Sequence, residues 1–199
     1  MSEFIARELE KTAEVIDRIR SSTELMATIE TIAARCIGAY RAQNKVLLAG
    51  NGGSAADAQH IAGELVGKLA FDRPALAAVA LTVDSSVLTA TGNDYGYEKI
   101  FERQIASLGR PGDMLIALST SGRSPNILAA LAEARRSQLV CIGFTGLGGG
   151  DMPGLCDVCL RIPSNETPKI QEGHIVCAHI ICGLIERALF DPPQPHGTG

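Results

Sequence analysis

The chain has 199 residues, of which 46% are hydrophobic, and its formal net charge is −4. This length and hydrophobic content suffice for one globular domain with a full core. Lysine and arginine are scattered rather than clustered, and the negative balance excludes a basic surface for nucleic acid. We therefore expect a single domain over residues 1–190 and no nucleic-acid partner.

The first ten residues lack the features of a targeting segment. They carry charges every few positions and have no apolar core of a signal peptide. We take residues 74–83 as the longest uncharged apolar stretch, which is about half of what a bilayer requires. These observations predict a soluble, cytoplasmic protein with no membrane partner.

The six cysteines are interpreted as structural residues. Cys141, Cys177 and Cys182 lie in apolar patterns, where cysteine behaves as a small buried hydrophobe. Cys156 and Cys159 are the one closely spaced pair. They fall in a predicted strand, in which side chains three positions apart face opposite sides, so no pairing is expected.

Two amphipathic helices are predicted at the start of the chain. Apolar residues recur at helical spacing over residues 4–20, and residues 21–24 resemble a capping box that starts a second helix, which runs to about residue 40. The apolar stripe of this helical hairpin, residues 1–42, is larger than one sheet face needs. We expect it to mediate oligomerisation, with packing inside one chain as the alternative.

Predicted strands and helices alternate over residues 43–190. The strands are expected at 46–49, 77–81, 113–118, 139–144 and 157–162, and the helices at 54–66, 85–91, 97–108, 127–135 and 170–190. This alternation predicts an α/β fold, a three-layer sandwich with a central parallel sheet flanked by helices and with ligands at the carboxyl ends of its strands. Residues 191–199 have no apolar pattern and are predicted to be disordered.

A glycine loop, residues 50–54, follows the first predicted strand. Its glycines permit a tight backbone with positive φ, and Ser54 is a suitable N-cap for the next helix, whose amino end attracts anions. The spacing matches neither the dinucleotide fingerprint nor the Walker loop. A plain turn between strand and helix therefore stays open as the alternative.

A serine loop, residues 119–126, follows the third predicted strand. Ser124 is a suitable N-cap and Pro125 a suitable first residue of the next helix. Hydroxyl groups beside a helix amino end suit a phosphate monoester. Helix capping explains Ser124 but not the other three hydroxyl residues, which are Ser119, Thr120 and Ser121.

Two predicted helices carry candidate catalytic or metal-binding side chains. His60 and Glu64 are four residues apart, so they lie on one helix face and can reach one ligand. On the last helix, Gln171 and His179 lie about 80° apart around the axis after two turns. These pairs suit a metal site or an acid/base pair. His174 lies roughly opposite His179 and is interpreted as a packing or surface residue.

Four segments are jointly specific: residues 50–64, 91–97, 119–126 and 167–174. Together they closely resemble the phosphoheptose isomerases, enzymes of the sugar isomerase (SIS) domain family, and the resemblance extends to about Phe190. It implies a homotetramer in the bacterial cytoplasm. It also implies conversion of D-sedoheptulose 7-phosphate to D-glycero-D-manno-heptose 7-phosphate, the first step of heptose synthesis for surface glycans such as lipopolysaccharide.

The resemblance also assigns roles to residues of this chain. It implies one Zn²⁺ per subunit, bound by His60, Glu64, Gln171 and His179, with Glu64 and His179 also acting as the acid/base pair. The implied substrate-binding residues are Asn51, Gly52, Gly53, Glu64, Asn93, Asp94, Ser119, Thr120, Ser121, Ser124 and Gln171.

Two other functions are compatible with the same fold. One is a non-catalytic SIS protein that binds a replication initiator, and the other is an isomerase of a different phosphosugar. The complete metal and acid/base set favours catalysis, because a binding protein does not need it. We also expect subunits to share sites, since His179 and the N-terminal helices are predicted near interfaces.

Overall fold

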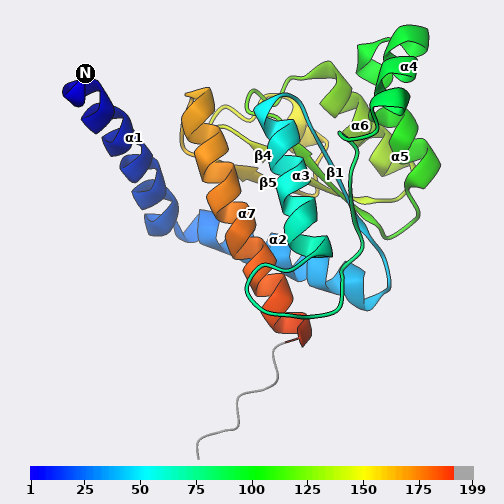
Figure 1. Cartoon of the computed structure of the whole chain (residues 1–199), viewed down its shortest axis with the longest axis horizontal. Helices are drawn as coiled ribbons and strands as arrows, with labels where there is room; N and C mark the ends of the chain where they lie inside the picture. Colours follow the sequence, from blue (N-terminus) through cyan, green and yellow to red (C-terminus); the bar gives the residue numbers. More distant parts are fainter. Residues whose placement is uncertain (191–199) are drawn as a thin grey trace, which may run out of the picture.

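The computed structural model describes residues 1–190 (Figure 1), so the predicted disorder of residues 191–199 lies outside the described residues. Five strands form one parallel sheet in the order β2-β1-β3-β4-β5. The central strands are buried at every position, as the apolar runs predict. The strands are β1 (Val46–Gly50), β2 (Ala78–Ala80), β3 (Met114–Leu118), β4 (Val140–Thr145) and β5 (Val158–Arg161).

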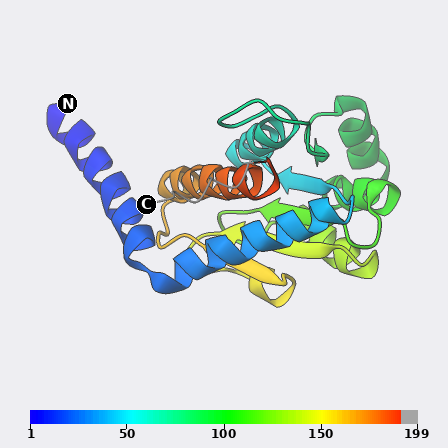
Figure 2. The same cartoon turned by 90° about the horizontal axis from the view of Figure 1, so that it is seen from below.

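Helices cover both faces of the sheet, which confirms the three-layer prediction. Two apolar cores, one on each side of the sheet, hold the layers together. Helices α3 and α7 lie side by side on one face (Figures 1 and 2). That face has α1 (Ser2–Ser21), α2 (Thr23–Arg41), α3 (Gly53–Val66) and α7 (Thr167–Phe190); the other has α4 (Ser85–Tyr95), α5 (Glu102–Leu108) and α6 (Pro125–Arg136).

Several predicted boundaries are wrong by a few residues. The helix predicted at 97–108 is divided into a short 3₁₀ helix, η1 (Tyr97–Lys99), and α5. Helix α4 continues to Tyr95, where Gly96, with φ 91°, ends it. The long last helix begins at Thr167, three residues before the predicted start.

Two predicted helix caps are also displaced. Gly52, with φ 55°, is the N-cap of α3, and Ser54 lies inside the first turn. At α2 the cap is Ser22 rather than Ser21, since the Ser22 hydroxyl accepts a hydrogen bond from the Leu25 N–H at 3.2 Å. Capping motifs thus located both helix starts to within one or two residues.

The two N-terminal helices are joined by Ser22 and diverge from each other (Figures 1 and 2). Val15 and Ile19 of α1 are buried. Phe4, Ile5 and Leu9, nearer the amino end of the same helix, are exposed. The apolar packing of α1 on the fold is therefore confined to its second half.

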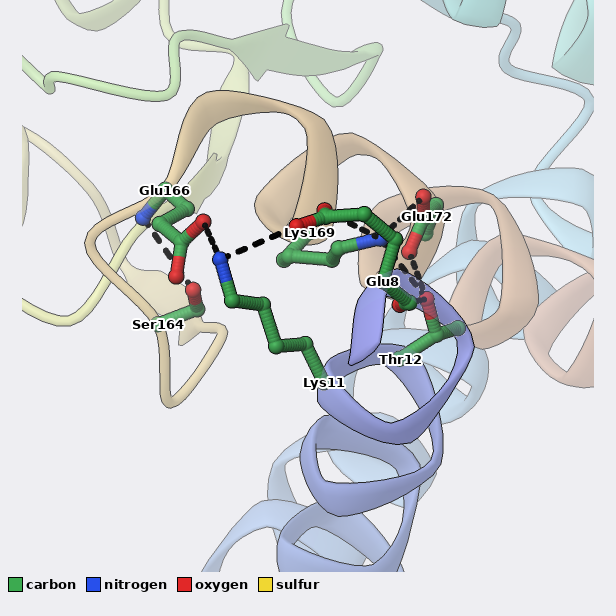
Figure 3. A network of polar contacts seen from close by, with 7 residues as sticks. All are labelled: Glu8, Lys11, Thr12, Ser164, Glu166, Lys169 and Glu172. Carbon is green, nitrogen blue, oxygen red and sulfur yellow. Dashed lines mark hydrogen bonds and ion pairs between the residues drawn. The ribbon is translucent and has the colours of Figure 1, made fainter. Parts of the chain in front are cut away.

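Polar contacts attach α1 to the first turn of α7 (Figure 3). The Lys169 ammonium donates to the Thr12 hydroxyl at 2.8 Å and to the Glu172 carboxylate at 3.1 Å, and Thr12 donates to Glu172 at 2.7 Å. Lys11 donates to Glu166 at 2.9 Å. Since Gln171 lies between Lys169 and Glu172, the network fixes the part of the helix that carries it.

Helix α7 contains a longer uncharged run than the one identified above. Residues 173–185 exceed 74–83 in length, so that prediction is wrong. By length and composition, α7 is the one helix within residues 1–190 that could cross a membrane. Its inner face is buried against α2 and α3, as in the core helix of a folded domain.

The expected orientation of Cys156 and Cys159 is also wrong. Strand β5 begins at Val158, so Cys156 precedes it, after the 3₁₀ helix η2 (Met152–Gly154). The two sulfur atoms do not point apart. Both face Gly143 on β4, where a Cβ atom would lie 2.7 Å from the sulfur of Cys156 and 3.1 Å from that of Cys159.

Candidate active site

The glycine loop connects the carboxyl end of β1 to α3. A Cβ atom at Gly50 would lie 2.3 Å from the Ser54 carbonyl oxygen, so only glycine fits there. A Cβ atom at Gly53 would lie 2.4 Å from Nε2 of Gln171. The missing side chains thus allow a tight turn and bring Gln171 of α7 against the backbone of the loop.

A cavity of about 360 Å³ opens beside this loop, between β1 and α4. Its lining includes Asn51, Gly52, Gly92 and Tyr97. Asn51 and Gly52, two predicted substrate residues, border this open space. Gly92 brings the end of α4 to the same cavity.

Three hydroxyl groups of the serine loop converge. Ser119 Oγ lies 3.0 Å from Ser124 Oγ and 3.5 Å from Ser121 Oγ, and Ser121 Oγ accepts from the Arg123 N–H at 3.2 Å. Ser124 and Pro125 occupy the predicted cap and first helical position of α6. The Ser124 hydroxyl points to Ser119 rather than to a helix N–H. Pro125 has no N–H and the Ile127 N–H donates to the Ser124 carbonyl at 3.0 Å, so the Asn126 N–H is the first-turn donor left for an anion.

Residues 146–151, after β4, support the serine loop. Gly122 has φ 64°, and a Cβ atom there would lie 1.9 Å from the Gly149 carbonyl oxygen. The Asp151 N–H donates to the Gly122 carbonyl at 2.9 Å, and the Gly146 N–H donates to the Thr120 carbonyl at 3.1 Å. These contacts fix the backbone that presents the hydroxyls.

Two residues outside the predicted set hold Asn51. Asn126, which is 2% exposed, exchanges two hydrogen bonds with the Asn51 amide at 2.8 and 2.9 Å, and the Tyr97 hydroxyl donates to the same amide oxygen at 3.1 Å. Both residues end motifs that the sequence analysis selected. Their positions in the motifs were therefore a signal, but the contact itself is between residues 75 positions apart.

Helices α3 and α7 bring three predicted metal ligands together. His60 Nε2 lies 3.1 Å from Glu64 Oε1 and 3.0 Å from His179 Nε2. The candidate ligand atoms of all three side chains lie within 4.8 Å of one another. Two imidazoles and one carboxylate at this separation match the donors and the space of a zinc site.

The fourth predicted ligand and two predicted substrate residues lie elsewhere. The Gln171 amide contacts Gly53 at the start of α3. Asn93 and Asp94 are exposed in the last turn of α4, where the Asn93 amide donates to the Asp94 carboxylate at 2.8 Å. The structure therefore groups His60, Glu64 and His179, whereas Gln171 lies against Gly53 and Asn93 and Asp94 lie on α4.

Asp57 is a further polar residue near the His60–Glu64–His179 group. It lies one helical turn before His60, and within the described residues its Oδ2 atom is buried without a hydrogen-bond partner. Burial raises the pKa of Asp57, while His60 acts in the opposite direction. An unpartnered carboxylate oxygen beside a candidate ligand imidazole fits a site that gains positive charge when it binds an ion.

His174 is a packing residue, which is one of the two roles expected from the sequence. It is fully buried against Phe144, and its Nε2 atom lies 3.2 Å from the Thr145 carbonyl oxygen. Burial lowers the pKa of His174 to about 4, so the ring is neutral at neutral pH.

Comparison with known proteins agrees with this geometry. A family model described as the SIS domain matches residues 9–146. A phosphoheptose isomerase of Burkholderia pseudomallei is 56% identical over 187 residues, covering 94% of this chain and 95% of that protein. One from Aneurinibacillus thermoaerophilus is 52% identical over 190 residues, covering 96% of each.

Solved structures show the same likeness. A phosphoheptose isomerase from Neisseria gonorrhoeae has a TM-score of 0.87 and 38% identity, covering 93% of this chain and 98% of that one. One from Francisella tularensis has a TM-score of 0.89 and 34% identity, covering 93% and 97%. With its parallel sheet, its converging hydroxyls and its His–Glu–His group, the chain belongs to the SIS domain family and, within it, to the phosphoheptose isomerases.

Proposed function

We propose that this protein converts D-sedoheptulose 7-phosphate to D-glycero-D-manno-heptose 7-phosphate, a step of heptose synthesis for bacterial surface glycans. The observation that carries the proposal is the convergence of His60, Glu64 and His179 on two adjacent helices. It occurs in a chain 56% identical to a phosphoheptose isomerase. The serine loop supplies a separate place for the phosphate group.

The reaction moves a carbonyl group from C2 to C1 of the sugar. It requires removal of a proton from C1, return of a proton to C2 and proton exchange between the two oxygens. We assign the carbon-bound proton to Glu64 and the oxygen-bound protons to His179. General acid/base action contributes about 10² to 10⁴ in rate, so the negative charge of the enediolate also needs stabilisation.

A metal ion fits the donors of this site, and we propose Zn²⁺ bound by His60, Glu64 and His179, with Gln171 as the fourth ligand. When bound, such an ion supplies Lewis-acid stabilisation of negative oxygen. The side chains of the site have roles other than binding the ion. Glu64 is partly exposed, with 21% of its side chain accessible, so it can reach a sugar as well as His60.

We place the phosphate on the serine loop. Ser119, Ser121 and Ser124 offer hydroxyl donors, and the start of α6 adds the Asn126 N–H and the positive end of the helix dipole. The glycine loop and Asn51 then lie beside the sugar. This division leaves the carbon chain between the serine loop and the catalytic pair.

The central test is Glu64→Gln, assayed for aldose formation from sedoheptulose 7-phosphate with zinc measured on the same sample. We expect turnover to fall at least about 100-fold, because the amide cannot accept the carbon-bound proton. Glu24→Gln, an exposed glutamate of α2, is the matched control. Near-normal turnover of Glu64→Gln with zinc still bound would contradict the assignment of the base.

The phosphate placement has its own test. Replacing Ser119 and Ser121 with alanine is expected to raise KM for the phosphorylated sugar and leave zinc content unchanged. An unchanged KM would contradict the placement. Assaying hexose and pentose phosphates in parallel separates the proposed substrate from other phosphosugars. Absence of turnover with every phosphosugar would favour a non-catalytic SIS protein.

We further propose a cytoplasmic homotetramer whose subunits each consist of one SIS domain over residues 1–190. An open apolar groove of about 430 Å³ between α1, α2 and α7 supports assembly. Its lining includes Ile16, Met26, Val176, Ile180 and Leu184. Because α7 also carries His179, an interface at this groove places a second subunit close to the catalytic helices.

A further inference from the structure

Cys156 and Cys159 differ from the other cysteines of the chain. Both are free and partly exposed, whereas Cys36, Cys141, Cys177 and Cys182 are free and buried. The pair lies at the edge of the sheet, with Cys156 in the turn between η2 and β5 and Cys159 in β5. An oxidant in solution can therefore reach these two thiols more readily than the other four.

The backbone between the two cysteines brings their sulfur atoms to one place. The Asp157 N–H donates to the Cys141 carbonyl at 2.8 Å, and the Asp157 carboxylate accepts from the Cys141 N–H at 2.7 Å. This anchor turns the chain so that both thiols lie over Gly143, the register partner of Cys159. A side chain at position 143 would fill the space that the two sulfur atoms share.

The two thiols are chemically unequal. A hydrogen bond from Cys156 lowers the pKa of Cys159, and the charge of Arg161 acts in the same direction against burial. The same hydrogen bond, together with burial, raises the pKa of Cys156. Since the thiolate is the nucleophile in disulfide exchange, Cys159 is the attacking residue of the pair.

The surroundings do not favour a metal site at this pair. Within residues 1–190, the one group of three or more His, Cys, Asp or Glu donors close enough to hold an ion is His60, Glu64 and His179. Structural zinc takes four protein ligands, and the neighbouring Asp157 carboxylate is engaged with the backbone of Cys141. Two converging thiols without a third donor suit a reversible disulfide.

We propose that Cys156 and Cys159 form a redox-active dithiol that is oxidised by a low-molecular-weight disulfide such as glutathione disulfide. The Cys159 thiolate attacks one sulfur of that disulfide, and the first glutathione leaves as a thiolate that takes up a proton. The Cys156 thiol then loses its proton and attacks the Cys159 sulfur, which releases the second glutathione. The protein loses two electrons and two protons, and the disulfide becomes two thiols.

The dithiol is connected to the serine loop through η2. The Met152 side chain packs over Gly143 beside both sulfur atoms, and the preceding Asp151 donates its N–H to the Gly122 carbonyl at 2.9 Å. Formation of the disulfide moves the two sulfur atoms. It thereby shifts Met152 and weakens the hydrogen bond from Asp151 to Gly122. We expect KM for the sugar phosphate to rise roughly threefold to tenfold, as for one weakened hydrogen bond. This consequence rests on the proposed function, whereas the disulfide itself does not.

The test exposes the folded full-length chain to glutathione disulfide and maps its cysteines by peptide mass spectrometry. We expect a Cys156–Cys159 disulfide in the unmodified chain. Cys156→Ser should stop at a glutathione adduct on Cys159, and Cys159→Ser should stay largely unmodified at the same exposure. The four buried cysteines are internal controls, since they should react with an alkylating reagent only after unfolding.

Three results would overturn parts of this inference. Failure of the disulfide to form at any ratio of oxidised to reduced glutathione excludes the redox-active dithiol. Faster adduct formation on Cys156 than on Cys159 in the single variants reverses the order of attack. An unchanged KM in fully oxidised enzyme, with Cys156→Ser/Cys159→Ser as control, excludes the connection to the serine loop. Failure of the proposed function is distinguishable, because reduced enzyme then lacks turnover while the disulfide still forms.

Discussion

Asn126 positions a predicted substrate residue without being exposed itself. Its buried amide is paired with the amide of Asn51 through two hydrogen bonds. A buried amide that loses its partner costs about 1 to 3 kcal/mol, so each asparagine depends on the other. The orientation of Asn51 toward the cavity is therefore set on α6, which also begins at the serine loop.

We predict that Asn126→Ala raises KM for the sugar phosphate about tenfold, because Asn51 loses its fixed orientation. Steady-state kinetics check this expectation. Asn165→Ala, an exposed asparagine in the turn before α7, is the matched control and should leave KM unchanged. Equal kinetic constants for the two variants would show that Asn126 has no positioning role.

Gly122 is the second residue on which the site geometry depends. We predict that Gly122→Ala raises KM and lowers the melting temperature, because alanine at φ 64° is strained by about 1 to 2 kcal/mol and its Cβ atom meets the Gly149 carbonyl. Gly148→Ala is the control, since a Cβ atom at Gly148 has no neighbour within 4 Å. Steady-state kinetics and thermal unfolding of both variants test this prediction. Equal KM values and equal melting temperatures would show that the contact with Gly149 does not constrain the loop.

At the scale of elements, a buried ion pair joins the two helices that hold the His–Glu–His group. The Arg73 guanidinium donates to the Glu64 carbonyl at 2.7 Å, to the Leu65 carbonyl at 2.9 Å and to the Glu186 carboxylate at 3.1 Å. The positive charge of Arg73 at the carboxyl end of α3 also interacts favourably with the negative end of the helix dipole. Arg73 thus joins the last turn of α3, which carries Glu64, to α7, which carries His179.

This ion pair predicts a specific pH dependence of stability. Burial alone would raise the pKa of Glu186, but hydrogen bonds from the backbone of Leu69 and Ala70 and from Arg73 outweigh it and lower that pKa below 4.5. A carboxyl group whose pKa is lower in the folded state stabilises the fold above its unfolded pKa. That stabilisation is lost as the pH falls through the folded value.

We therefore expect the free energy of unfolding, measured with urea, to fall as the pH drops below about 4.5. Glu186→Gln should be less stable than the unmodified chain at neutral pH by about 3 kcal/mol, because Arg73 loses its buried partner. The difference between the two proteins should shrink as the pH falls. A constant difference across this pH range would show that Glu186 does not contribute through its charge.

At the scale of the whole molecule, the N-terminal helices and α7 leave apolar side chains exposed. Leu9 of α1 is 66% exposed, and Ile180 of α7 is 46% exposed. The amino end of α1 extends from the fold (Figure 1), and Glu8, Lys11 and Thr12 make its polar contacts with α7 and the residue before it (Figure 3). Apolar area of this kind on a folded chain marks an interaction surface.

We predict that Leu9→Glu or Ile180→Glu breaks the proposed homotetramer into smaller species, because a charge cannot be buried in an apolar interface without a partner. Light scattering coupled to size-exclusion chromatography measures this change. Arg135→Glu on α6, across the sheet, should leave the mass unchanged. A tetramer that survives both apolar-to-charged substitutions would place the interface elsewhere.

The sequence alone was sufficient for the layers and for the choice of candidate catalytic side chains. Alternating apolar runs and amphipathic segments depend on local periodicity, so they predicted the parallel sheet and both helix layers. Helical spacing placed His60 and Glu64 on one face for the same reason. The family motifs then supplied the predicted ligand and substrate residues, which periodicity could not indicate.

Tertiary structure decided the contacts between segments distant in the chain. The Asn51–Asn126 pair, the Arg73–Glu186 ion pair and the approach of His179 to His60 each join residues 75 or more positions apart. The prediction that Cys156 and Cys159 face opposite sides is wrong. Asp157 is hydrogen-bonded to Cys141 of β4, and β5 begins only at Val158, after Cys156. Such contacts depend on how the elements pack in three dimensions, which no local pattern encodes.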